Sequence, residues 1–224
     1  MTQDFQLMEI QANVLFKYDS SGRMTELNEP LSIDAPLFFL GRTSEGNVVR
    51  FHKDFPNLKM NKVIEVMNNG DQVDLGKIIE MINEIKLISS IWMGPAYVFP
   101  ESFNKKSNAV KITNENKDLL LENFPNIFKE FEWRQPCFAI IEDGNAVSIC
   151  CCARKSAIAA EASVETLYGY KGRGYGTESV IAWAIEVKKE KLKPLYSTAW
   201  DNFSSQSIAE KLGLQKYGVD LHLS

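Results

Sequence analysis

The stretch YGYKGRGYGTES, residues 168–179, carries four glycines within eight residues and directly precedes a segment with helical spacing. Glycines at 172, 174 and 176 let successive backbone N–H groups converge on one point, with no Cβ atom in the way. The helix that begins near Thr177 adds the positive end of its dipole, worth up to about 2 kcal/mol for an anion. Lys171 and Arg173 add positive side chains. The stretch therefore predicts a cradle for a pyrophosphate.

Two other glycine-rich motifs fit this stretch poorly. A Walker loop ends in Gly-Lys-Ser/Thr, whereas this loop ends in Gly176-Thr177 with no lysine between them. A dinucleotide fingerprint needs a βαβ unit in a parallel sheet, but here the preceding strand follows an antiparallel hairpin and two strands remain after the loop. The remaining alternative is a turn whose glycines bind nothing.

Periodic apolar residues predict an α+β protein, in which helices flank a mixed, mostly antiparallel sheet. The second half reads as strand, helix, three strands, helix, strand, helix and strand, with helices over 114–124, 177–190 and 202–212. The first half reads as two hairpins, two helices and one strand, over 13–28, 35–52, 61–69, 74–85 and 90–100.

The polar segment 101–108 predicts a domain boundary. We expect an N-terminal α/β region of unassigned role over 1–105, packed on a second domain over 106–224.

Composition excludes several classes of partner. The net charge of -4 gives no reason to expect a nucleic acid or an acidic membrane surface, and no stretch approaches the ~20 apolar residues of a membrane span. Cys137 and the run 150–152 have neither disulfide nor metal-ligand spacing, so we expect no metal. Buried thiols in a reducing compartment predict the cytoplasm, and a reactive thiol near the site is the alternative.

Residues 171–176, KGRGYG, resemble the Arg/Gln-x-x-Gly-x-Gly/Ala pyrophosphate motif of the GNAT superfamily of acetyl-CoA-dependent N-acyltransferases, with lysine at the first position. Downstream, N-x-x-S at 202–205 and IAEKLGL at 208–214 are similar to the second signature, N-x-x-S…KLGF. The resemblance covers 108–214. EASVET, YKGRGYG and WDN look most like a bacterial branch that includes antibiotic self-resistance acetyltransferases.

The resemblance implies acetyl-CoA as co-substrate. The strand ending at Thr166 should hold the pantetheine arm and splay from the strand over 194–200. The loop should hold the pyrophosphate, and Asn202 and Ser205 should contact the arm near the thioester. The implied acetyl-CoA-binding residues are Thr166, Lys171, Gly172, Arg173, Gly174, Tyr175, Gly176, Thr177, Asn202 and Ser205.

The implied reaction needs a base and an acid. Glu161 and Glu165 lie on the polar face of the strand before the loop and are the candidate bases, with Glu161 preferred; solvated carboxylates are the alternative. Many family members use a tyrosine in the last helix as acid, but Ala209 occupies that position here. Other candidate acids are Tyr168, Tyr196, Ser205 and Tyr217.

We therefore expect direct acetyl transfer to an amine of a small molecule. The alternatives are a non-catalytic CoA-binding module, favoured by Ala209, and a protein N-acetyltransferase. A monomer or homodimer is expected, and the single strand after Gly213 leaves a neighbouring half or subunit to complete the sheet. His222 in that strand is expected to be inert.

Overall fold

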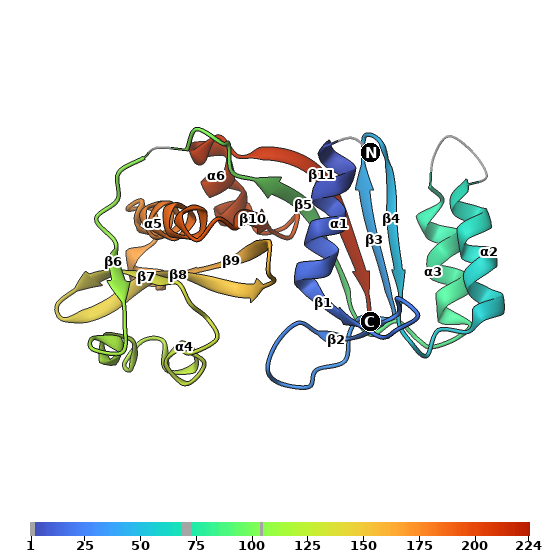
Figure 1. The fold of residues 1–224 in the computed structure, drawn as a ribbon, viewed down its shortest axis with the longest axis horizontal. Coiled ribbons are helices and arrows are strands. Elements are labelled where there is room, and N and C mark those ends of the chain that lie inside the picture. Colours follow the sequence, from blue (N-terminus) through green and yellow to red (C-terminus); the bar gives the residue numbers. More distant parts are fainter. Residues whose placement is uncertain (1–2, 69–72, 104) are drawn as a thin grey trace.

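The chain forms a nine-stranded mixed sheet with helices on both faces, beside a small two-stranded sheet (Figure 1). The computed structural model describes residues 3–68, 73–103 and 105–224. The order of strands in the large sheet is β4-β3-β11-β5-β10-β9-β8-β7-β6, and within the described residues β9 and β10 make its one parallel pair. The predicted α+β class, with a mostly antiparallel sheet flanked by helices, is confirmed.

Each half of the chain contributes both helices and strands. The first half contains α1 (Gln3–Leu15), β1 (Phe16–Tyr18), β2 (Met24–Leu27), β3 (Phe38–Thr43), β4 (Gly46–Phe51), α2 (Asn57–Asn68), α3 (Leu75–Asn83) and β5 (Ile91–Val98). The second half contains β6 (Val110–Ile112), a 3-10 turn (Lys117–Leu120), α4 (Pro125–Lys129), β7 (Cys137–Glu142), β8 (Asn145–Lys155), β9 (Ala159–Thr166), α5 (Tyr175–Lys189), β10 (Lys193–Ser197), α6 (Phe203–Leu212) and β11 (Gln215–Leu223). The element order predicted for the second half is confirmed.

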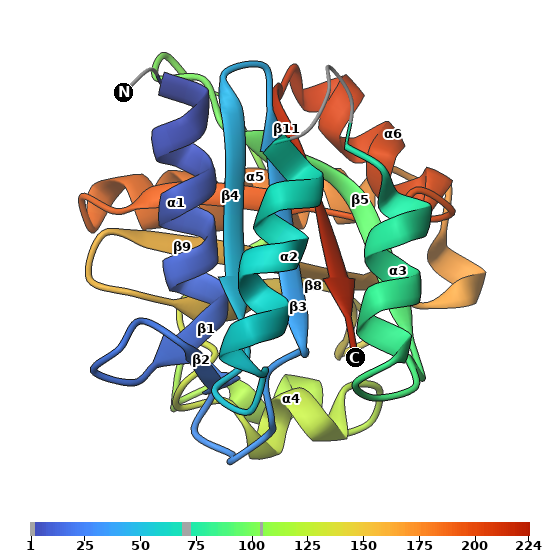
Figure 2. The same cartoon turned by 90° about the vertical axis from the view of Figure 1, so that its right-hand side faces the viewer.

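Alternation along the central strands assigns a different set of helices to each face of the sheet. Ala160 and Tyr196 pack with α5 and α6, whereas their neighbours Ala159 and Leu195 pack with α1 on the opposite face. At one end of the sheet, α2 and α3 lie in front of β3, β4 and β11 (Figure 2). At the other end, α4 packs on β7 and β8.

Helix α1 was not predicted from the sequence, which indicated a strand over 13–18. Only Phe16–Tyr18 is extended, because Leu7, Met8 and neighbouring apolar residues bury one side of a helix against the sheet. Glycines on adjacent strands make room for Met8: a Cβ at Gly41 would lie 2.3 Å from Met8 Cγ, and one at Gly218 would lie 2.6 Å from Met8 Cε. This close approach fixes α1 over β3 and β11.

A second correction concerns the helix predicted over 114–124. That segment contains the 3-10 turn, and the α-helix that follows begins at Pro125, a residue well suited to the first turn of a helix. Residue 69 of the predicted helix 61–69 and residue 104 of the predicted boundary lie outside the described residues.

The large sheet combines strands from both sides of the predicted domain boundary. β5, from the first half of the chain, lies between β10 and β11 of the second half and pairs with both. β3 then pairs with the other side of β11, so the N-terminal half supplies the strands that continue the sheet beyond β11.

Candidate active site

The parallel strands β9 and β10 separate at the centre of the sheet. They pair at three positions, the last joining Leu195 to Glu161, although β9 continues to Thr166 and β10 to Ser197. The predicted splaying of these strands is confirmed. Their unpaired ends leave backbone N–H and C=O groups available at the gap.

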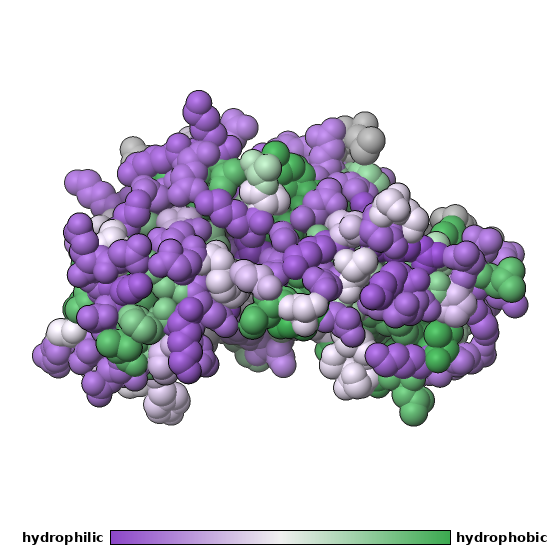
Figure 3. Space-filling model, turned by 60° about the horizontal axis from the view of Figure 1, so that its bottom comes forward, coloured by the Kyte–Doolittle hydropathy of each residue, from purple (hydrophilic) through white to green (hydrophobic). Residues whose placement is uncertain are grey.

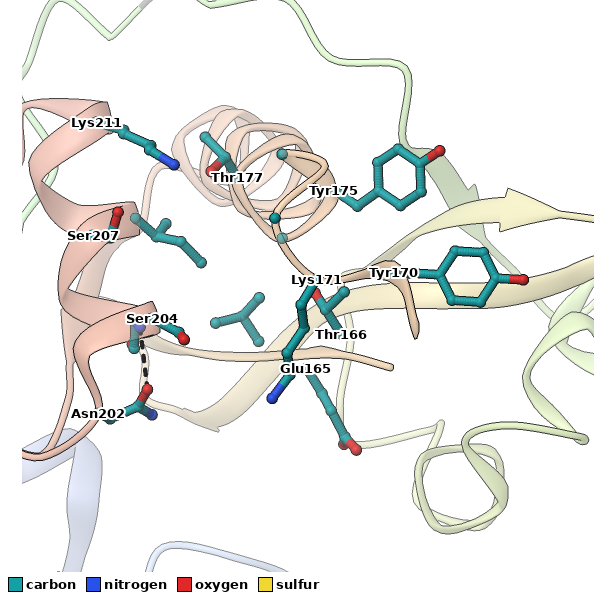
Figure 4. Close-up of a pocket in the computed structure, with 16 residues that line it drawn as sticks. Glu165, Thr166, Tyr170, Lys171, Tyr175, Thr177, Asn202, Ser204, Ser207 and Lys211 are labelled. Carbon is teal, nitrogen blue, oxygen red and sulfur yellow. Dashed lines mark hydrogen bonds between the residues drawn. The ribbon is translucent and has the colours of Figure 1, made fainter. Parts of the chain in front are cut away.

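A cavity of about 330 Å³ lies beside this gap, between the glycine loop, the end of β9 and α6. We call it the glycine-loop cavity. Figure 4 shows Ser204, Ser207 and Lys211 of α6 on one side of it and Thr166, Lys171 and Thr177 on the other. Its lining includes nine of the ten residues predicted to bind acetyl-CoA: Thr166, Lys171, Gly172, Gly174, Tyr175, Gly176, Thr177, Asn202 and Ser205.

The glycines of the loop have different roles. Gly172 and Gly174 have φ of 81° and 87°, and a Cβ at either position would meet nothing within 4 Å. Gly174 caps the N-terminus of α5 from this left-handed conformation. A Cβ at Gly176 would instead lie 3.1 Å from Thr166 Oγ1 and 3.2 Å from Ile208 Cδ1, so this glycine lets α5 approach β9 and α6 closely. The loop thus leaves open space at the start of a 15-residue helix.

The two cations of the loop are placed differently. Lys171 lines the glycine-loop cavity. Arg173, the one predicted binding residue that does not, lays its guanidinium over the Tyr170 ring at 5.0 Å and donates to Gly169 O at 3.2 Å. Lys211 of α6 lines the cavity too, and sequence reasoning missed it although it lies within the KLG signature. Lysines on both walls make the cavity suited to an anion.

The N-x-x-S signature caps α6. Asn202 Oδ1 accepts from Ser205 N at 3.1 Å, and Asn202 is the N-cap residue. The Ser205 hydroxyl is 2.6 Å from the hydroxyl of Tyr196, which is buried beneath it. Burial raises the pKa of Tyr196 well above its usual range, so its hydroxyl keeps its proton. The signature therefore orients a serine at the cavity wall.

We expect Asn202→Ala to lower the free energy of unfolding by about 1 kcal/mol, because the substitution leaves the first turn of α6 without its cap. Denaturant unfolding measures this loss. Asn202→Asp is the matched control and should retain most of the stability, since aspartate caps as well as asparagine. Equal loss in both variants would contradict a capping role.

Glu161 lies in a second cavity, of about 470 Å³, which we call the carboxylate cavity. Its lining comprises Leu15, Phe16, Leu27, Ile33, Asp34, Pro36, Ser90, Trp92, Ala153, Arg154, Glu161, Ala162, Ser197, His222 and Ser224. Only 3% of Glu161 is exposed, and neither of its carboxylate oxygens has a hydrogen-bond partner of good geometry among the described residues. Burial, supported by the charge of Asp220 and opposed by Ser197 and Arg154, raises the pKa of Glu161 to about 7.

A chain of buried polar groups links α1 to β11. Tyr217 donates to Gln11 Oε1 at 2.6 Å, and Gln11 donates from Nε2 to Asp220 Oδ2 at 3.1 Å. The same Oδ2 atom lies 3.0 Å from His222 Nε2. His222, expected to be inert, is thus paired with a buried carboxylate at the cavity wall. No local pattern signals this cluster, because Gln11 and Asp220 are 209 residues apart.

The other candidate catalytic residues lie in different parts of the structure. Glu165 lines the glycine-loop cavity but is exposed. Of the four candidate acids Tyr168, Tyr196, Ser205 and Tyr217, Ser205 lines that cavity. Ala209 lies on the buried face of α6, in the core.

All four cysteines are free and buried, and none lines either cavity. Burial raises the pKa of Cys152 to about 12 and that of Cys150 well above its usual range. Neither thiol is therefore ionised near neutral pH.

Two kinds of feature are absent from the part of the chain that the structure describes. It contains no helix long and apolar enough to cross a membrane. It also contains no group of three His, Cys, Asp or Glu side chains placed to hold a metal ion.

Comparison with known proteins identifies the family. The pattern of the GNAT acetyltransferase family matches residues 96–218, more than half of the chain. No curated protein matches the sequence.

Solved structures share the fold at low identity. A GCN5-related N-acetyltransferase from Kribbella flavida is 12% identical, with a TM-score of 0.52 over 100% of this chain and 95% of that one. A GCN5-related N-acetyltransferase-like protein from Streptococcus suis is 16% identical, with a TM-score of 0.51 over 99% and 100%. A protein from Novosphingobium aromaticivorans assigned to the GNAT family is 14% identical, with a TM-score of 0.52; the match covers 61% of this chain and 65% of that one.

Proposed function

The chain belongs to the GNAT acetyltransferase family, and on this premise we propose that it moves an acetyl group from acetyl-CoA to the amine of a small molecule. The observation that carries the proposal is the position of two cavities at one gap in the sheet. The glycine-loop cavity lies on the α5 and α6 side, and the carboxylate cavity with its buried Glu161 lies on the α1 side.

The glycine-loop cavity fits the phosphates of CoA. Gly172 and Gly174 leave space that a Cβ would occupy, the N-terminus of α5 faces this space, and Lys171 and Lys211 stand on its walls. The unpaired end of β9 offers backbone groups to the pantetheine arm. Bound acetyl-CoA would supply a thioester carbonyl and a thiolate leaving group.

Glu161 is the proposed base. An alkylamine has a pKa of ~10.4, so removing its proton at pH 7 costs about 4–5 kcal/mol. A proton acceptor beside the gap therefore speeds the reaction. With a pKa raised to about 7, Glu161 is ionised in a large share of molecules at neutral pH and can accept the amine proton. Its burial keeps bulk water from competing for that position.

The proposed source of the returning proton is the Tyr196–Ser205 pair, since Ser205 lines the glycine-loop cavity and Tyr196 is hydrogen-bonded to its hydroxyl. This pair would take the place of the usual tyrosine at position 209. In the net reaction a nitrogen–carbon bond forms, the carbon–sulfur bond breaks, and one proton passes from nitrogen to sulfur.

Further parts of the proposal concern the setting. Four free thiols favour a reducing compartment, for which we propose the cytoplasm. We propose a monomer or homodimer that needs neither a metal nor a nucleic acid or membrane partner.

Calorimetric titration with acetyl-CoA and CoA tests the first half of the proposal, and we expect micromolar binding of both. Thiol release over a panel of amines tests the second half, and we expect a rate well above background hydrolysis with at least one small amine. Binding without thiol release from any small amine or lysine peptide would favour the rival function, a CoA-binding module, to which the buried Ala209 points. Absence of binding would overturn both.

A further inference from the structure

The carboxylate cavity has the placement of an acceptor site, an assignment that rests on the proposed function. Glu161 occupies the last position at which β9 pairs with β10, and its side chain lies on the α1 side of the sheet. Val164 and Thr166, farther along β9, line the glycine-loop cavity. The two cavities therefore open on opposite faces of the sheet and share the gap between β9 and β10. A molecule in the carboxylate cavity can reach that gap without crossing the glycine loop.

The charge of the cavity selects a cation. Glu161 is 3% exposed, and neither of its carboxylate oxygens has a hydrogen-bond partner of good geometry within the described parts of the chain. The charge of Asp220, a buried residue outside the lining, acts on Glu161 as well. Arg154, which also lines the cavity, is paired with Glu29. Unpartnered carboxylate oxygens in a buried site are costly, and an ammonium group with three donors would satisfy them.

The walls of the cavity select an apolar body. The His222 ring is held among three aromatic rings, with centroid distances of 5.6 Å to Phe16, 5.2 Å to Phe39 and 4.8 Å to Trp92. Six further lining side chains are aliphatic or proline: Leu15, Leu27, Ile33, Pro36, Ala153 and Ala162. Polar lining residues besides Glu161 and His222 are Asp34, Ser90, Arg154, Ser197 and Ser224. On the face that brings the bottom of Figure 1 forward, apolar surface appears near the middle of the molecule, between its two halves (Figure 3). The apolar side chains, which make up more than half of the lining, favour a ligand with an apolar body.

We propose that the carboxylate cavity is the acceptor site and takes a compact primary amine with an aromatic or branched apolar body. Its ammonium group faces Glu161, and its body packs against Trp92, Phe16 and His222. A volume of about 470 Å³ suits a molecule of this size. This proposal gives the N-terminal half a role in acceptor binding, because α1, β1 and β5 contribute residues to the wall of the cavity.

Three probes of similar size test the charge and the body separately. The protein is titrated with 2-phenylethylamine, 2-phenylethanol and 3-phenylpropionate, with and without saturating CoA. We expect the amine to bind, and the neutral and anionic probes to bind at least ~10-fold more weakly. A polyhydroxylated amine, such as an aminoglycoside, should bind at least ~10-fold more weakly than 2-phenylethylamine. Preference for the aminoglycoside, the anion or a lysine peptide would overturn the inference.

Trp92→Ala tests whether the amine binds in the carboxylate cavity. We expect this variant to raise the KM for 2-phenylethylamine about tenfold with a smaller effect on kcat, and to leave CoA affinity unchanged. Leu58→Ala, at an exposed position on α2 outside the lining of both cavities, is the matched control and should leave all three values unchanged. An unaltered KM in folded Trp92→Ala would overturn the inference.

The two proposals fail in different ways. A protein that binds CoA and acetylates only hydrophilic amines retains the proposed function and loses this acceptor assignment. A protein that does not bind CoA loses the proposed function, and the titrations without CoA still decide which ligand the carboxylate cavity takes.

Discussion

Gly174→Val is expected to abolish CoA binding, with an affinity loss of more than ~100-fold. Gly174 has φ of 87°, and the space around its missing side chain is open. A valine there places three carbon atoms where a phosphate must approach the N-terminus of α5, and it strains a backbone conformation that β-branched residues avoid. Calorimetric titration of the variant with CoA measures the loss.

Gly22→Val separates these two effects. Gly22 lies in the turn between β1 and β2, has φ of 78°, and also has nothing within 4 Å of an added Cβ. The backbone strain is therefore matched, but the site lies outside the glycine-loop cavity. We expect Gly22→Val to lose stability comparably and to bind CoA as the wild type does. Retained CoA affinity in Gly174→Val would remove the phosphate cradle from the proposal.

Glu161→Gln is expected to lower kcat by about 10²–10⁴-fold near pH 7, the range typical of losing a general base. CoA affinity should not change, because Glu161 lies outside the glycine-loop cavity. The deficit should narrow as the pH rises, since an alkylamine loses its proton without help near its own pKa of ~10.4. Rates measured from pH 6 to 10 give this profile, and the wild-type inflection near pH 7 should vanish from the variant.

Glu165→Gln is the companion variant, because Glu165 lies on the same face of β9 and is exposed. A larger loss in Glu165→Gln than in Glu161→Gln would move the base to Glu165. Equal and small losses of kcat in both variants would indicate that water, rather than either glutamate, removes the amine proton.

Glu161→Gln should also stabilise the fold at neutral and higher pH. The pKa of Glu161 is raised from 4.5 in the unfolded chain to about 7 in the folded one, so the folded state binds more protons between these values. Stability contributed by this group therefore falls as the pH rises from 4.5 to 7. Glu161→Gln removes that penalty, worth on the order of 3 kcal/mol above pH 7, and thermal unfolding should show a larger gain at pH 8 than at pH 5.

The glycine loop and its surroundings could be predicted because their signals are local. Glycines before a helix, a serine three residues after an asparagine and alternating carboxylates on a strand each act within a few residues. The glycines, Asn202, Ser205 and Glu165 lie around the glycine-loop cavity in the structure, whereas Glu161 lies in the carboxylate cavity. Helix α1 could not be predicted in this way, since its form depends on Met8 fitting over glycines of two distant strands.

The carboxylate cavity was hidden from the sequence for a related reason. His222 shows no partner in its own segment beyond Asp220, and the significance of that pair depends on Gln11 and Glu161, which reach it from α1 and β9. Charge and burial at such a junction follow from the order of strands in the sheet. That order, with β5 inserted between β10 and β11, is a property of the whole chain.

β11 pairs with β3 on one side and with β5 on the other, although it follows both by more than a hundred residues. On the ribosome, the edges of β3 and β5 that it covers must therefore wait, unpaired, until residue 223 has emerged. Unpaired edges recruit other chains. A nascent chain interrupted before β11 therefore presents two open strand edges, one on β3 and one on β5, to any other unfinished chain nearby.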